Sequence, residues 1–228
     1  MQELKVIVTG YDHYEGVDVN PSYEVPRALA EGGAGRPDRG RADAQEVLDG
    51  VDLEIKAVSL PVSFARAWPI LHGVIEDVKP DIVIATGLKH KARGIAMERC
   101  AVNLKEVSDD RDEGDLVREP VNPGGPAAYW TRLPLRAILH DFAHSGIPAT
   151  LSSDAGTYVC NALFYSLLDW ASSHPTVLAG FVSLPLVNES AQAGCGLPLA
   201  QQVRAGQEVV RETARYYLQP SSSPILLA

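Results

Sequence analysis

The stretch ATLSSDAGTYVCNALFYSLL, residues 149–168, decides the expected fold, because it joins a strand-like run to a helix-like run. Residues 149–153 predict a buried strand, and the apolar spacing of residues 163–168 predicts one face of an amphipathic helix. Between them, Asp154-Ala155-Gly156-Thr157 predicts a turn whose Asp and Thr side chains cap the helix. Cys160 then lies in the first helical turn, where the macrodipole favours a thiolate. The stretch alone favours a buried structural cysteine over a nucleophile, since free cysteine is among the most buried residue types.

The rest of the chain repeats this alternation of strands and helices, which is typical of an α/β fold around a mostly parallel sheet. The first run, LKVIVT, is apolar and rich in β-branched residues, as expected of a strand buried on both faces. Expected strands are residues 4–9, 53–60, 81–86 and 176–184; expected helices are residues 23–29, 42–48, 63–78, 133–143 and 199–218.

Length and composition predict one globular domain, residues 1–228, with an exposed excursion at 31–50. The net charge is −9 and the basic residues are scattered, so nucleic acid is not an expected partner. No apolar run is long enough to cross a bilayer, and the N-terminal residues do not resemble an export signal. These observations predict a cytoplasmic protein without a membrane partner.

No cofactor or metal is expected. The sequence has neither a dinucleotide fingerprint nor a phosphate-binding loop of the Walker type. His140 and His144 have a spacing that can bind zinc, but no third ligand is evident. The acidic segment 108–115 lacks the ligand spacing of an EF-hand, and the three cysteines fit neither a disulfide framework nor a zinc motif.

Two further segments carry ionisable groups in unusual places. Residues 11–16 follow the first strand and are dense in aromatic and charged side chains, so they predict either a ligand-binding loop or a cover over the sheet edge. Glu98 and Arg99 interrupt the apolar segment 95–104, where a charge is costly unless it is exposed, paired or functional. A structural ion pair and a functional carboxylate both remain open.

Together these segments resemble the pyroglutamyl peptidase I (pyrrolidone-carboxylate peptidase) family of cysteine peptidases over most of the chain. Two motifs in the right order carry the resemblance: the run SDAGTYVCN at residues 153–161 and the run ERCAVN at 98–103. Shorter matches are found at residues 10–14, 20–22, 60–62, 79–81, 125–129 and 133–135.

The resemblance implies a single three-layer α/β/α domain, commonly in a homo-oligomer, that acts on a peptide N-terminus or a small molecule carrying a cyclic amide. It implies that Cys160 is the nucleophile and Glu98 the acidic member of a Cys-His-Glu triad. The positions implied for substrate binding are Tyr11, Tyr14, Asn20, Leu88 and Tyr158.

One position departs from the family pattern. The family's histidine lies in a segment of the form Phe-Ile-His-Val-Pro, whereas this chain reads FVSLP, which puts Ser183 at the histidine position. A hydroxyl cannot hold a proton as an imidazolium does at neutral pH. Two hypotheses follow: a cysteine hydrolase in which His13 or His90 replaces the base, or a catalytically silent relative that binds a ligand or partner. We favour the hydrolase.

Overall fold

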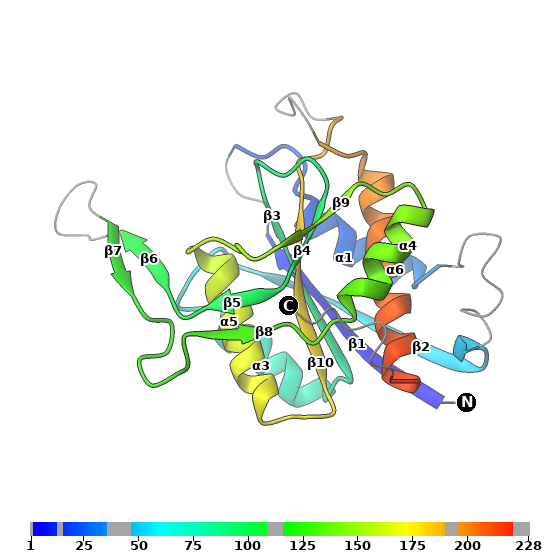
Figure 1. Ribbon diagram of the computed structural model, residues 1–228, viewed down its shortest axis with the longest axis horizontal. Coiled ribbons are helices and arrows are strands. Elements are labelled where there is room, and N and C mark those ends of the chain that lie inside the picture. Colours follow the sequence, from blue (N-terminus) through cyan, green and yellow to red (C-terminus); the bar gives the residue numbers. More distant parts are fainter. Residues whose placement is uncertain (1, 13–15, 36–46, 109–115, 190–195, 221–228) are drawn as a thin grey trace.

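The computed structural model describes residues 2–12, 16–35, 47–108, 116–189 and 196–220. Its centre is a six-stranded sheet with the strand order β2-β1-β3-β10-β4-β9 (Figure 1). β4 runs antiparallel to β10, and the other strand pairs within this sheet are parallel. The strands are β1 (Gln2–Tyr11), β2 (Val51–Leu60), β3 (Ile82–Leu88), β4 (Ile95–Glu98), β9 (Ala149–Ser152) and β10 (Leu178–Leu184).

Helices cover both faces of this sheet (Figure 1). One layer contains α1 (Pro21–Gly32), α4 (Leu135–His144) and α6 (Leu199–Leu218), and the other contains α3 (Ala67–Val78) and α5 (Val159–Ser172). The buried side chains accordingly form two clusters, one on each side of the sheet. The predicted three-layer α/β/α fold is confirmed.

The burial pattern of each strand follows from its place in the sheet. β3 lies between β1 and β10 and is buried from Ile82 to Gly87, because helices cover both of its faces. β2 lies at the edge of the sheet, and most of its residues alternate between partly buried and exposed. The apolar run in the sequence of β3 therefore reflects burial on both sides.

Two small antiparallel ladders were not predicted. β5 (Cys100–Val102) pairs with β8 (Ala128–Trp130), and β6 (Lys105–Ser108) pairs with β7 (Leu116–Glu119). β6 and β7 extend away from the three layers (Figure 1). The segment 95–104 is thus two strands, β4 and β5, that belong to different sheets and meet at Arg99.

The excursion expected at residues 31–50 is only partly an exposed segment. α1 continues to Gly32, and Ala34 is buried with its carbonyl oxygen accepting a hydrogen bond from the Arg211 guanidinium. The prediction of exposure is wrong at Ala34, because this short run packs against α6. Residues 36–46, most of the predicted helix at 42–48, and the tail 221–228 lie outside the described residues.

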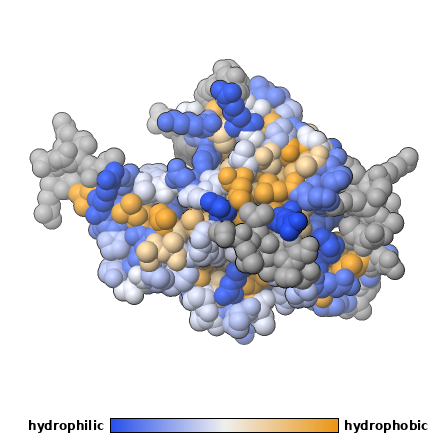
Figure 2. All heavy atoms as spheres, in the orientation of Figure 1, coloured by the Kyte–Doolittle hydropathy of each residue, from blue (hydrophilic) through white to orange (hydrophobic). Residues whose placement is uncertain are grey.

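In the described part of the chain, no helix combines the length and the apolar character needed to cross a membrane. On the face shown in Figure 2, groups of hydrophobic residues are interspersed with hydrophilic ones.

Candidate active site

Cys160 is the second residue of α5, as the sequence predicts, but the helix start is built differently. Tyr158 is the N-cap, and no side chain among the described residues forms a capping hydrogen bond with the first turn. The Asp154 carboxylate instead accepts a hydrogen bond from the Gly156 amide at 2.9 Å, and the Thr157 hydroxyl donates to Glu106 at 2.7 Å. The predicted capping by Asp154 and Thr157 is therefore wrong. The first amides of α5 keep their donor capacity beside the Cys160 thiol.

The thiol faces the carboxyl end of β3. A Cβ atom added to Gly87 would lie 2.7 Å from Cys160 Sγ and 2.8 Å from Phe181 Cζ, so only glycine leaves room for both side chains. The Tyr11 hydroxyl, at the end of β1, forms a hydrogen bond with the thiol and also donates to the Val159 carbonyl oxygen at 3.3 Å. Two strand ends thus hold the thiol in place.

Burial raises the pKa of the Cys160 thiol to about 12. The Tyr11 hydrogen bond and the Lys89 ammonium lower this pKa, while the Glu98 carboxylate raises it. Desolvation therefore opposes the helix dipole, which by itself favours the thiolate. Burial also raises the pKa of Tyr11 well above its ordinary value, which keeps its hydroxyl neutral and able to donate.

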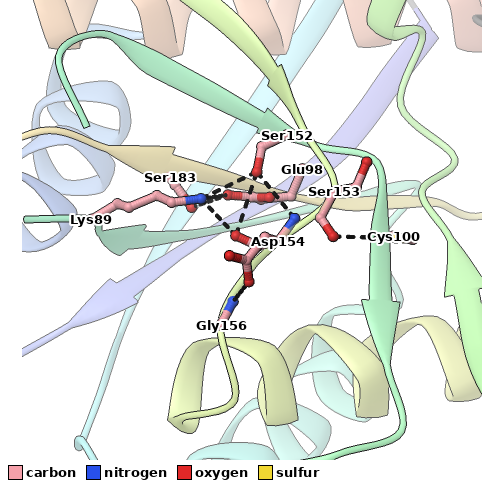
Figure 3. A network of polar contacts seen from close by, with 8 residues as sticks. All are labelled: Lys89, Glu98, Cys100, Ser152, Ser153, Asp154, Gly156 and Ser183. Carbon is pink, nitrogen blue, oxygen red and sulfur yellow. Dashed lines mark hydrogen bonds and ion pairs between the residues drawn. The ribbon is translucent and has the colours of Figure 1, made fainter. Parts of the chain in front are cut away.

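Glu98, at the end of β4, has a fully buried side chain. Its Oε1 atom accepts a hydrogen bond from the Ser183 hydroxyl at 2.7 Å and one from the Lys89 amine at 3.1 Å (Figure 3). Its Oε2 atom is buried without a hydrogen-bond partner in the described part of the chain. The structure therefore brings Glu98 and Ser183 into contact, as expected of neighbours in one site.

Arg99 does not pair with Glu98. Its guanidinium donates to the Ser153 hydroxyl and lies over the Trp130 ring, 6.0 Å from the ring centroid. Glu98 instead contacts the Lys89 amine, so the two charged side chains have different partners. The alternative of a structural Glu98–Arg99 ion pair is wrong, because the counter-charge of Glu98 is Lys89.

Lys89 is the functional candidate that sequence reasoning missed. Its amine donates to Glu98, to the Ser152 hydroxyl at 3.1 Å and to the Asp154 carbonyl oxygen at 2.6 Å (Figure 3). Its backbone amide donates to the Leu184 carbonyl oxygen at 2.8 Å, next to Ser183. One signal was available: a carboxylate in an apolar segment needs a counter-charge, and Lys89 directly follows a buried strand.

A cavity of about 420 Å³ opens beside Cys160. Three of the residues expected to bind substrate line it, together with His90, one of the two expected substitute bases. Ser22 and Val62 also line it and were not predicted. The lining residues are Tyr11, Ser22, Val62, Leu88, His90, Tyr158, Val159 and Cys160.

Asn20 has a different position from the other expected substrate-binding residues. It is fully buried as the N-cap of α1, where its side chain accepts a hydrogen bond from the Ser22 amide and donates to the carbonyl oxygens of Tyr11 and Asp12. It therefore fixes the chain between β1 and α1 and does not line the cavity. His13 and Tyr14 lie outside the described residues.

A family profile described as pyroglutamyl peptidase matches residues 4–212. The chain belongs to the pyroglutamyl peptidase family. It is 38% identical over 192 residues to the pyrrolidone-carboxylate peptidase of Bacillus amyloliquefaciens, covering 82% of this chain and 80% of the relative. It is 34% identical over 224 residues to that of Bacillus subtilis strain 168, covering 96% of both chains.

Solved structures agree with this family assignment. The crystal structure of Bacillus amyloliquefaciens pyroglutamyl peptidase I matches with a TM-score of 0.79 and 33% identity, over 94% of this chain and 98% of that one. The pyrrolidone carboxyl peptidase of Thermococcus litoralis matches with a TM-score of 0.80 and 26% identity, over 99% of both chains. This member of the pyroglutamyl peptidase family has no group of three or more His, Cys, Asp or Glu side chains placed to hold a metal among its described residues.

Proposed function

We propose that this chain is a cysteine peptidase that removes an N-terminal pyroglutamyl residue, or cleaves a related small cyclic amide, with Cys160 as the nucleophile. The observation that carries the proposal is the position of Cys160 at the uncapped start of α5, on a cavity and beside a buried carboxylate. Membership of the pyroglutamyl peptidase family supports the same substrate class.

The chemistry begins with attack of the Cys160 sulfur on the carbonyl carbon of the scissile amide. The negative charge that develops on the carbonyl oxygen is stabilised by the uncapped amides of the first turn of α5 and by the positive end of the helix dipole. Collapse of the tetrahedral intermediate releases the amine and leaves a thioester, which water then hydrolyses. Residues 159–161 thus supply both nucleophile and donors.

The cavity supports recognition of a small lactam ring. Tyr11 and Tyr158 offer aromatic surfaces, and Val62 and Leu88 add apolar walls, which suit the methylene groups of such a ring. The Phe64 ring contacts Tyr158 edge-on, with the centroids 5.2 Å apart, and orients it. The roles of these residues in substrate binding are part of the proposal.

Glu98 is proposed as the supporting acidic group, and Ser183 is proposed to occupy the position of the family's histidine. The 2.7 Å contact between Ser183 Oγ and Glu98 Oε1 supports this placement, since a triad base contacts its acidic partner. Of the two substitute bases considered, His90 lines the cavity with Cys160. His13 stays a prediction.

The catalytically silent alternative rests on Ser183 alone and finds no support in the comparisons, since the relatives named above are peptidases. The test is hydrolysis of pyroglutamyl-p-nitroanilide by the purified chain. We expect turnover that is lost in Cys160→Ala and kept in Cys100→Ala, a matched control at the other partly exposed free cysteine among the described residues. Absence of turnover in the unaltered chain with pyroglutamyl and simple lactam substrates would sink the proposal.

The homo-oligomer and the cytoplasmic location stay predictions from the resemblance and the sequence. Light scattering coupled to size-exclusion chromatography tests the first, with a mass near 24.5 kDa contradicting it. Fractionation of the cells that express the protein tests the second.

A further inference from the structure

The proposed reaction needs a group that exchanges protons, and neither Glu98 nor Ser183 is built to do so alone. A serine hydroxyl does not take up or release a proton near neutral pH. The Glu98 carboxylate is fully buried, and its Oε1 atom accepts from both Ser183 and Lys89. Of these two hydrogen-bond donors to Glu98, Lys89 is the one that carries a positive charge.

Lys89 occupies a position that suits an acid–base group. Its backbone continues from β3 two residues after Gly87, whose α carbon faces the Cys160 sulfur. Its side chain is one-third exposed (33%), whereas that of Glu98 is fully buried (0%), so the amine connects the carboxylate with the solvent side of the site. The same ammonium lies close enough to Cys160 to influence the thiol electrostatically.

We propose that the Lys89 amine carries the proton transfers that Ser183 cannot perform, with Glu98 holding it in place as the acidic member holds an imidazole. This inference rests on the proposed function, because it assigns a role within that reaction. The lysine side chain suits the task, since it is flexible and carries three donors on one nitrogen.

The protons balance through one cycle. The Cys160 thiol first loses its proton to solvent, the thiolate adds to the scissile carbonyl carbon, and the C–N bond then breaks as the tetrahedral intermediate collapses. The Lys89 ammonium gives one proton to the leaving nitrogen, which departs as a neutral amine. The neutral Lys89 amine then takes a proton from the water that attacks the thioester, and breakage of the C–S bond returns the thiolate. The product acid ionises into solvent.

Other charged or titratable groups face the Lys89 amine and the thiol from neighbouring elements. Glu98 approaches from β4, Tyr11 from β1, and His90 from the same loop as Lys89. The turn after β9 contributes the carbonyl oxygen of Asp154, which accepts a hydrogen bond from the amine. His90 is thus the competing base.

The competing explanation for Lys89 is purely structural: a counter-charge that makes a buried carboxylate tolerable. An arginine would satisfy that role as well, because its guanidinium keeps the positive charge but does not release a proton in proteins. The two explanations therefore differ in what Lys89→Arg does to turnover.

The experiment measures kcat/KM for pyroglutamyl-p-nitroanilide between pH 6 and 11, together with iodoacetamide alkylation of Cys160, in the full chain. We expect Lys89→Arg to lower kcat/KM by about a hundred- to ten-thousand-fold while alkylation stays close to the unaltered rate. Lys91→Ala, an exposed lysine in the same loop, is the matched control and keeps full turnover. The double variant Lys89→Ala/Ser183→His should turn over faster than Lys89→Ala alone. Its pH profile of kcat/KM should show a new inflection near the ordinary histidine pKa of about 6.5.

Three results decide the matter. Turnover of Lys89→Arg equal to that of Lys91→Ala would overturn the inference and leave the proposed function standing. Loss of turnover in His90→Gln, with Lys89→Arg unaffected, would overturn it in favour of His90. Absence of turnover in the unaltered chain would remove the proposed function and the inference together. A Lys89→Ala variant that does not fold changes nothing, since Lys89→Arg decides on its own.

Discussion

Replacing Gly87 by alanine tests how tightly the thiol is held against β3. The added Cβ would lie 2.7 Å from Cys160 Sγ and 2.8 Å from Phe181 Cζ. Ordinary carbon contacts are about 3.5–4.0 Å, so both atoms must retreat by about 1 Å. The Phe181 ring is fully buried and packs on Phe164 with 5.5 Å between centroids, so most of the movement falls on Cys160.

The cost of Gly87→Ala should appear separately in stability and in reactivity. Overpacking of this kind costs about 1–3 kcal/mol, which for a chain of this size lowers Tm by about 2–12 °C. A displacement of about 1 Å in the nucleophile lowers turnover by about a hundredfold. Calorimetry measures the first effect, and kcat/KM for pyroglutamyl-p-nitroanilide measures the second.

Gly73→Ala is the matched control. Gly73 is exposed in α3, and a Cβ there would meet nothing within 4 Å. Alanine in a helix interior is favoured over glycine by about 0.5–1 kcal/mol, so this variant should be slightly more stable and equally active. A Gly87→Ala variant that melts and turns over like the unaltered chain would refute the close approach of β3 to the thiol.

Three further predictions follow from the site and its supports. Because burial raises the pKa of Cys160 to about 12, the rate of its alkylation by iodoacetamide should rise about tenfold per pH unit from pH 7 to 11, and a plateau near pH 8 would contradict this. Tyr11→Phe removes a hydrogen bond that lowers this pKa, so it should slow the alkylation about three- to tenfold at each pH. The Asn161 side chain accepts a hydrogen bond from the Val102 amide and donates to the carbonyl oxygens of Val102 and Leu104, so Asn161→Ala should destabilise the protein by about 1–3 kcal/mol for each backbone group left unpaired. Urea titration measures the free energy of unfolding, and a total loss below about 1 kcal/mol would contradict this prediction. A hydrogen bond to Asp169 raises the pKa of Tyr129 to about 12, so on raising the pH the unfolded chain loses this phenol proton before the folded chain does. The contribution of Tyr129 to the free energy of unfolding is therefore complete below pH 10 and is lost as pH rises through 12. Tyr129→Phe should weaken this alkaline loss of stability in urea titrations, and an unchanged dependence on pH would contradict the prediction.

The sequence predicts best those elements whose residues decide their structure locally. The helix expected at 199–218 is α6 with the same ends, because its apolar residues keep the helical period throughout. The runs of β1, β3 and β10 were found because burial on both faces requires continuous apolar residues.

The small ladders could not be found in this way. β5 pairs with β8 across more than twenty intervening residues, and each strand is three residues long. Such short strands carry no readable alternation, and their pairing is set by the fold around them. The antiparallel direction of β4 within a mostly parallel sheet is equally a property of the whole chain.

The site shows the same division. Cys160, Glu98 and Ser183 were named from the sequence because each lies within a motif. Lys89 was not, since its importance comes from reaching a carboxylate on another strand. The position of Cys160 at a helix start is visible in the sequence, whereas the burial that raises the pKa of its thiol is not.

The contacts of Lys89 also have a mechanical side. In the sheet order, β10 and β4 lie between β3, which Lys89 directly follows, and β9, whose Ser152 hydroxyl accepts a hydrogen bond from the Lys89 amine. The Lys89 side chain therefore links the two sides of the sheet at one end. It is hydrogen-bonded to the outer strand β9, which pairs with β4 through four residues. That strand leads directly into the turn before Cys160. Substitutions at position 89 will therefore change both the attachment of β9 to the sheet and the activity. Among variants at this position, we expect Tm and kcat/KM to rise and fall together.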